Sequence, residues 1–164
     1  MLSDAKRPSV VSLVIGGPAK GSWWSHPKGR EIYALLEQLG QHPDLLAVKL
    51  IEGKVTFVHR RLWPAVLAIA RARDDVQMKG LSPAARRLLA RVDEKGEVEA
   101  HGPVVKELES RLLVHAAQLH TKSGAHTILL TSWPLWTERH APVGRAVPLA
   151  RARKLLDTRP GTTS

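Results

Sequence analysis

The 164-residue sequence contains no cysteine. This absence excludes disulfide-stabilised secreted domains and zinc modules built on thiolate ligands. No segment reaches the ~18 consecutive apolar residues that a membrane-spanning helix requires. Lys6 and Arg7 precede a short apolar run, but that run ends in Gly-Gly-Pro without the small residues of a signal-peptide cleavage site. Together these absences predict a soluble, cytoplasmic protein that has no membrane partner.

Acidic residues are also few relative to basic ones. The chain holds 25 Lys and Arg against 15 Asp and Glu, which gives a formal net charge of +10. A protein with this charge attracts polyanions, and nucleic acid is the most common of them. The excess is +5 over residues 1–80, +1 over 81–140 and +4 over 141–164. The charge therefore indicates nucleic-acid binding through both ends of the chain. The alternative is a charge that only keeps the protein in solution.

Residues 9–80 have the pattern of a first lobe. We expect the N-terminal segment that precedes them, residues 1–8, to be disordered. Ser9–Ile15 is short and β-branched, which predicts a buried strand. Apolar residues then recur at helical spacing, and a glycine lies in the turn of a predicted hairpin. The predicted elements are a helix over 30–39, strands over 45–51 and 55–59, and a helix over 62–73.

A second lobe is predicted over residues 81–140, followed by a basic C-terminal helix and tail over 141–164. Ser82 and Pro83 are typical of the N-cap and the first position of a helix. Residues 93–100 indicate an acidic turn or a short wing. The other predicted elements are helices over 83–92 and 103–112, strands over 113–121 and 126–132, and a basic helix over 149–156.

The order of two helices followed by a hairpin over residues 83–132 is that of a winged-helix unit. Helix and hairpin also follow one another earlier, over 30–59. The sequence therefore predicts an α+β, winged-helix-like protein made of two helix–hairpin lobes, or of two winged helices in tandem.

Three segments carry a resemblance to a known family, and they read LSPAARRLLARV, VKELESRLLVHAAQLHTKSGAHTILLTSW and GKVTFVHRRLWPAVLAI. They resemble the winged-helix domains of bacterial helix-turn-helix proteins related to AlkZ-type DNA glycosylases. The resemblance covers residues 45–133 and implies a winged-helix fold, duplex DNA as the ligand and a role in DNA repair. Those glycosylases carry a Gln-x-Asp catalytic pair, whereas Gln41 and Asp44 have the wrong spacing. Glycosylase chemistry is therefore not implied.

The helix that would enter the major groove in such a unit is nearly neutral. Its polar residues are Lys106, Glu107, Glu109, Ser110 and Arg111. A major-groove helix normally offers Arg, Lys, Asn or Gln to base edges, with few carboxylates nearby. We therefore expect weak base readout from this helix, and the alternative is a unit that packs or binds a protein partner.

The loop at residues 16–30 is chemically the most unusual stretch. It places Trp23 and Trp24 among basic residues, directly before a predicted helix. Indole rings stack on bases, and a helix N-terminus attracts phosphate. The alternative is that one or both tryptophans anchor the loop to the core. The order Lys20-Gly21-Ser22 does not match the Gly-Lys-Ser/Thr order of a P-loop.

Two further basic segments complete the candidate interface. His59-Arg60-Arg61 precedes a predicted helix, where arginines oppose the helix dipole unless an anion lies close by. The C-terminal helix is the densest basic segment of the chain. The alternative for His59-Arg60-Arg61 is a solvated turn, and the alternative for the C-terminal helix is a solvated, partly frayed helix. The predicted nucleic-acid contacts are Lys20, Trp23, Trp24, His26, Lys28, Arg30, His59, Arg60, Arg61, Lys106, Arg111, Lys122, Arg151, Arg153 and Lys154.

His115, His120 and His126 form the one histidine cluster of the sequence. A hairpin turn at 122–125 would bring His120 and His126 together, but the spacing fixes no third ligand. Capping contacts or contacts of the wing with phosphate are therefore favoured over a metal, and no metal or cofactor is predicted. No catalytic triad or carboxylate pair can be picked from the sequence, so a binding protein is favoured over an enzyme.

These observations predict a DNA-binding winged-helix protein that contacts mainly the phosphate backbone, in DNA repair or transcription regulation. Such binding depends strongly on salt and weakly on sequence. Two alternatives are an enzyme acting on nucleic acid, with a pocket around Trp23, Trp24, His26 and His59, and a protein-interaction adaptor.

Overall fold

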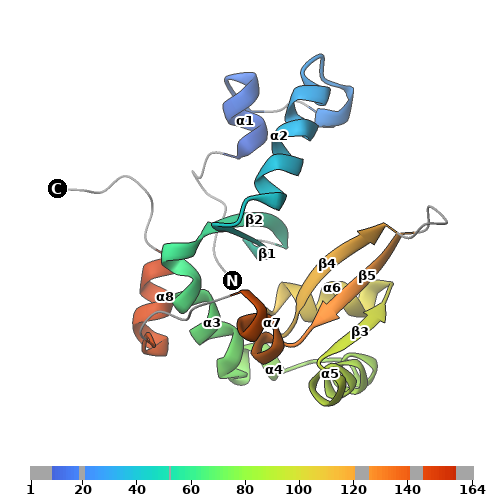
Figure 1. The fold of residues 1–164 in the computed structure, drawn as a ribbon, viewed down its shortest axis with the longest axis vertical. Coiled ribbons are helices and arrows are strands. Elements are labelled where there is room, and N and C mark those ends of the chain that lie inside the picture. Colours follow the sequence, from blue (N-terminus) through green and yellow to red (C-terminus); the bar gives the residue numbers. More distant parts are fainter. Residues whose placement is uncertain (1–8, 19–20, 52, 121–125, 141–145, 158–164) are drawn as a thin grey trace.

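The computed structural model describes residues 9–18, 21–51, 53–120, 126–140 and 146–157. Within these ranges the chain forms helices around two separate antiparallel sheets, β1–β2 and β3–β5–β4 (Figure 1). The α+β class predicted from the sequence is therefore confirmed. No helix in these ranges is both long enough and apolar enough to cross a membrane.

The N-terminal arm, residues 9–18 and 21–41, projects from the β1–β2 sheet at one end of the molecule (Figure 1). It consists of α1 (Val10–Ile15), the 3-10 turn η1 (Trp23–Ser25) and α2 (Gly29–Gln41). The predicted buried strand at 9–15 is wrong, because this segment is helical and none of its residues is buried. Ser9 and Ser12 form a capping box at the start of this helix. These local hydrogen bonds outweigh the preference of β-branched residues for strands, because the segment has no strand to pair with in the described part of the chain.

The predicted hairpin is present as β1 (Leu45–Ile51) and β2 (Lys54–His59), paired with Leu46 opposite Val58. Gly53 has a φ of +72°, the left-handed conformation that its turn requires. The 3-10 turn η2 (Arg60–Leu62) then leads into α3 (Trp63–Ala72), and α4 (Asp75–Met78) follows. The hairpin and α3 therefore have nearly the predicted limits.

The middle of the chain runs α5 (Pro83–Lys95), β3 (Glu97–Ala100), α6 (Pro103–Ser110), β4 (His115–His120) and β5 (His126–Thr131). The acidic turn or wing predicted over 93–100 is wrong. Its first residues extend α5 to Lys95, and the rest form β3, which pairs with β5 and places Val98 opposite Leu130. Val98 is buried, so the short strand is held by its contribution to the core as well as by backbone bonds.

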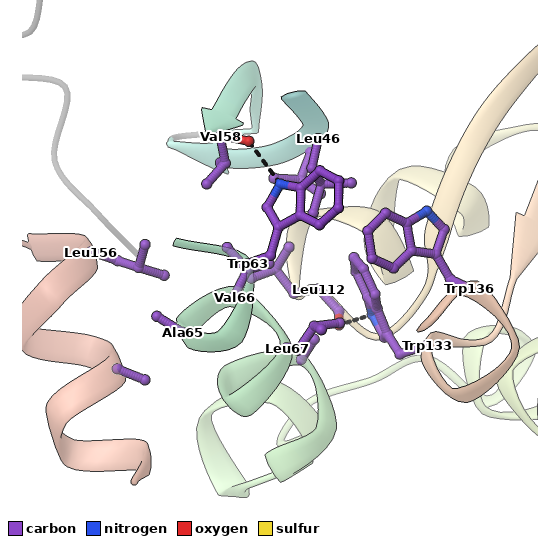
Figure 2. Close-up of a cluster of buried hydrophobic side chains, with 13 residues drawn as sticks. Leu46, Val58, Trp63, Ala65, Val66, Leu67, Leu112, Trp133, Trp136 and Leu156 are labelled. Atoms are coloured by element: carbon purple, nitrogen blue, oxygen red, sulfur yellow. Dashed lines mark hydrogen bonds between the residues drawn. The ribbon is translucent and has the colours of Figure 1, made fainter. Parts of the chain in front are cut away.

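The last elements are α7 (Trp133–His140), which was not predicted as a helix, and α8 (Leu149–Asp157), which lies alongside α3 (Figure 1). Both contribute to a first hydrophobic core over the β1–β2 sheet (Figure 2). In it, the Trp63 indole N–H donates to the carbonyl of Val58 over 2.9 Å, and the Trp133 indole N–H donates to that of Leu112 over 2.7 Å. The C-terminal helices therefore pack on the first lobe rather than trail from it.

A second hydrophobic core lies between α5, α6 and the three-stranded sheet. Val105, Leu108 and Leu130 are fully buried there. Leu112, which follows α6, has a φ of +55° although it is not glycine. Burial of its side chain in the first core and the bond from Trp133 to its carbonyl offset this strain. Leu112 therefore connects the two cores at the start of the hairpin.

Candidate nucleic-acid interface

The basic side chains separate into two groups, those held by carboxylates and those that face solvent alone. Ion pairs hold Lys49 to Glu109, Arg60 to Asp44, Arg73 to Asp93, Arg139 to Glu97 and Arg153 to Asp74. Within the described part of the chain, the exposed basic side chains without an ion pair or hydrogen bond are Arg30, Arg61, Lys79, Arg87, Arg91, Lys95, Lys106, Arg151 and Lys154.

The arginines before α3 differ from one another in this respect. The Arg60 guanidinium lies 3.0 Å from the carboxylate of Asp44. The anion expected beside an arginine at this helix N-terminus is therefore supplied by the protein itself. His59 is the N-cap of η2, and its Nδ1 accepts from the backbone N–H of Arg61. The Arg61 guanidinium is exposed and has no partner among the described residues. Arg61 is therefore the cation of this corner that is free to meet a phosphate.

The C-terminal helix shows the same division. Ala152 and Leu156 are buried against α3, while Arg153 forms an ion pair with Asp74, just beyond the end of α3. Arg151 and Lys154 are exposed and three residues apart, which places them on one face of α8. The docked helix therefore presents two unpaired cations, as the predicted phosphate contacts require.

Helix α6, the presumptive reader of the major groove, is occupied by contacts inside the protein. Glu107 accepts the backbone N–H and the hydroxyl of Ser82, both at 2.8 Å, and these bonds lower the pKa of its carboxyl. Glu109 pairs with Lys49 of β1. Only Pro103 and Lys106 of α6 are exposed, so the helix offers a single cation to a ligand.

Arg111 also has a structural contact that the sequence did not reveal. Its guanidinium donates to the carbonyl oxygens of Gln77 and Lys79, at 2.9 and 2.6 Å. In return the Gln77 side-chain amide donates to the Arg111 carbonyl. Arg111 therefore joins the start of the hairpin to the segment before α5.

Two further predicted nucleic-acid contacts, Lys20 and Lys122, lie outside the residues that the structure describes.

Helix α5 presents a row of cations that the sequence analysis did not select. Arg87, Arg91 and Lys95 are exposed and spaced by four residues, which places them within one helix face. Like charges at this spacing destabilise an isolated helix. The spacing alone could have identified the row. The near-zero net charge of residues 81–140 concealed this row of cations. That sum counts Asp93, Glu97 and Glu109 against the α5 cations, whereas these carboxylates form ion pairs with basic residues outside α5.

The arm carries the predicted tryptophans outside both cores. Trp23 and Trp24 stack with ring centroids 4.0 Å apart, and Trp24 is 63% exposed. His26, Lys28 and Arg30 follow them, all exposed. The alternative that a tryptophan anchors the loop in the core therefore does not hold for Trp24.

Of the three predicted histidines, only His115 has a described side chain. His120 does pair in register with His126, although the side chains of both lie outside the described set. His115 packs instead against Trp133 and Trp136, and burial lowers its pKa to about 4. The neutral ring is thus part of the first core's edge.

Comparison of the chain with protein-family models gave no match, and comparison with curated proteins and with solved structures gave none either. The resemblance to the relatives of AlkZ-type glycosylases therefore stays a prediction.

Proposed function

We propose that this protein binds DNA mainly through the phosphate backbone, using cations on its flanking elements rather than a reading helix. The observation that supports this most directly is the contrast between elements. Arg61, Arg151 and Lys154 are exposed and unpaired in the described structure, whereas α6 offers only Lys106. Contacts with phosphate position a protein on DNA and carry no sequence information directly.

The proposal includes a winged-helix-like unit over residues 83–131. Its sheet has the order β3–β5–β4, and the β4–β5 hairpin occupies the place of a wing after α5 and α6. In a helix-turn-helix unit the second helix exposes several polar side chains to base edges. The contacts of Glu107 and Glu109 leave α6 without such a surface. The unit would therefore add the α5 cations to the phosphate contacts of the flanking elements, and the proposed role is in DNA repair or transcription regulation.

The test is a titration of a fluorescently labelled duplex, followed by anisotropy at about 50 mM and about 200 mM salt. We expect binding at the lower salt concentration and an affinity at least tenfold weaker at the higher one, because each phosphate contact releases counterions. A second titration with K106Q checks the assignment of α6, and this variant should keep the wild-type affinity within about threefold. Failure of the wild type to bind at low salt would overturn the proposed function.

A further inference from the structure

The N-terminal arm carries the largest group of exposed aromatic rings in the described structure. Trp24 is 63% exposed and Tyr33 is 46% exposed, although rings of this size normally contribute to a core. The Trp24 ring stacks on Trp23 at an interplanar angle of 24°, and its centroid lies 5.6 Å from that of Tyr33. The three rings form one continuous array, whose outer surface belongs to Trp24 and Tyr33.

The array is held in place by close packing of the backbone. Gly29 is buried at the start of α2, and a Cβ there would lie 3.1 Å from the carbonyl oxygen of Trp24 and 3.2 Å from that of Trp23. The Gly29 N–H also donates to the carbonyl of His26 over 2.7 Å. A side chain at this position would require the tryptophan turn to move by a few tenths of an ångström, so glycine favours this close approach to α2. A surface that is packed against α2 before the ligand arrives lowers the entropic cost of binding.

Basic residues follow the tryptophans directly in the chain. The side chains of His26, Lys28 and Arg30 are exposed, and the Lys28 ammonium bonds to the carbonyl of Val14 rather than to a carboxylate. Glu31 is the sole acidic residue between 21 and 36. Cations near an exposed aromatic surface suit a ligand that combines planar rings with phosphates. Single-stranded nucleic acid has both, and its bases, unlike those of a duplex, are free to stack.

We propose that the Trp24–Tyr33 surface is a stacking site for unpaired bases of single-stranded DNA, with Lys28 and Arg30 meeting the adjoining phosphates. This rests on the proposed nucleic-acid binding and adds the part of the ligand that the arm recognises. Trp24 contributes the stacking surface, Trp23 supports it from behind, and Gly29 sets its position. The flanking cations on α8 and η2 would bind the neighbouring duplex, so the preferred ligand contains both kinds of strand.

The test compares two oligonucleotides of about 12 nucleotides, one of thymidine and one of abasic residues with the same number of phosphates. Wild type, W24A and W24F are titrated with each by anisotropy. V76A is the control for loss of an exposed apolar side chain, since Val76 is 72% exposed and lies on α4. Thermal unfolding monitors the fold of each variant.

We expect the wild type and V76A to bind the thymidine strand at least tenfold more tightly than the abasic strand. W24A should lose that preference and keep its affinity for the abasic strand and for a duplex, while W24F keeps most of the preference. Equal binding of both strands by the wild type, or equal losses for both strands in W24A, would overturn the stacking site and leave duplex binding intact. Absence of binding to any of these ligands would overturn the proposed function as well.

Discussion

Neighbouring arginines on the same element provide a sharp test of the interface. Arg61 and Arg151 are exposed and unpaired among the described residues, whereas Arg60 pairs with Asp44 and Arg153 with Asp74. The double variants R61Q/R151Q and R60Q/R153Q lower the net charge of the protein equally. They differ in whether the removed guanidinium was free to contact a phosphate, so a difference in DNA binding reports position rather than total charge.

The magnitude follows from counterion release. Each phosphate contact on a duplex contributes about 0.9 to the slope of log affinity against log salt concentration. R61Q/R151Q should therefore lower the magnitude of that slope by about 1.8, and R60Q/R153Q should leave it nearly unchanged. The assay is duplex binding by anisotropy over a series of salt concentrations, with thermal unfolding as the check on folding. Equal slope changes in the two double variants would refute the assignment of contacts to unpaired arginines.

Three further predictions concern the scaffold. First, the pKa of His115 is lowered from 6.5 to about 4, so between these pH values the unfolded chain binds a proton that the native state does not. Stability is therefore full above about pH 6.5 and falls by up to about 3 kcal/mol as the pH drops to about 4, and urea unfolding of H115F should lack this decline. Second, L108A should lose about 2–5 kcal/mol of unfolding free energy, because Leu108 is fully buried, whereas V76A should change it by less than about 0.5 kcal/mol. Third, S82A should cost about 1 kcal/mol through the lost cap of α5, and an NMR titration should show the Glu107 carboxyl pKa rising towards its ordinary value. The first prediction is contradicted if the stability of H115F declines with falling pH as that of the wild type does. Equal losses of unfolding free energy in L108A and V76A would contradict the second, and an unchanged Glu107 pKa in S82A would contradict the third.

Local sequence signals predicted much of the fold. The Gly53 turn and the apolar strands around it gave the β1–β2 hairpin, and Ser82 with Pro83 gave the start of α5, where the Ser82 hydroxyl accepts the Ala85 N–H. These elements are set by turn and capping chemistry that involves only neighbouring residues. Ser9–Ile15 shows the limit, because β-branched residues indicate a strand only where another strand is available to pair.

Elements that depend on distant partners could not be predicted in the same way. Strand β3 is fixed by pairing with β5, which begins 26 residues after β3 ends. Similarly, α7 becomes a helix with Trp133 and Trp136 buried in a core that the β1–β2 hairpin and α3 complete. Nothing in the Trp-Pro-Leu-Trp segment itself reveals that destination.

The candidate site could be predicted in part, for the same reason. The sequence identifies the basic segments and the tryptophan pair, but it does not show which cation meets a carboxylate. Arg61 and Arg151 differ from Arg60 and Arg153 only through Asp44 and Asp74, which lie 16 and 79 residues away from the arginines they hold. Such long-range pairing also concealed the free cations on α5.

The central claim is that DNA is bound through its backbone and not through a reading helix. The most direct measurement is the affinity of the wild-type protein for two duplexes of equal length and unrelated sequence, across a series of salt concentrations. The account predicts affinities that agree within about threefold and that fall in parallel as salt increases. A preference of about 10³ or more for one duplex, as specific binding proteins show, would contradict the account, and so would an affinity that does not respond to salt.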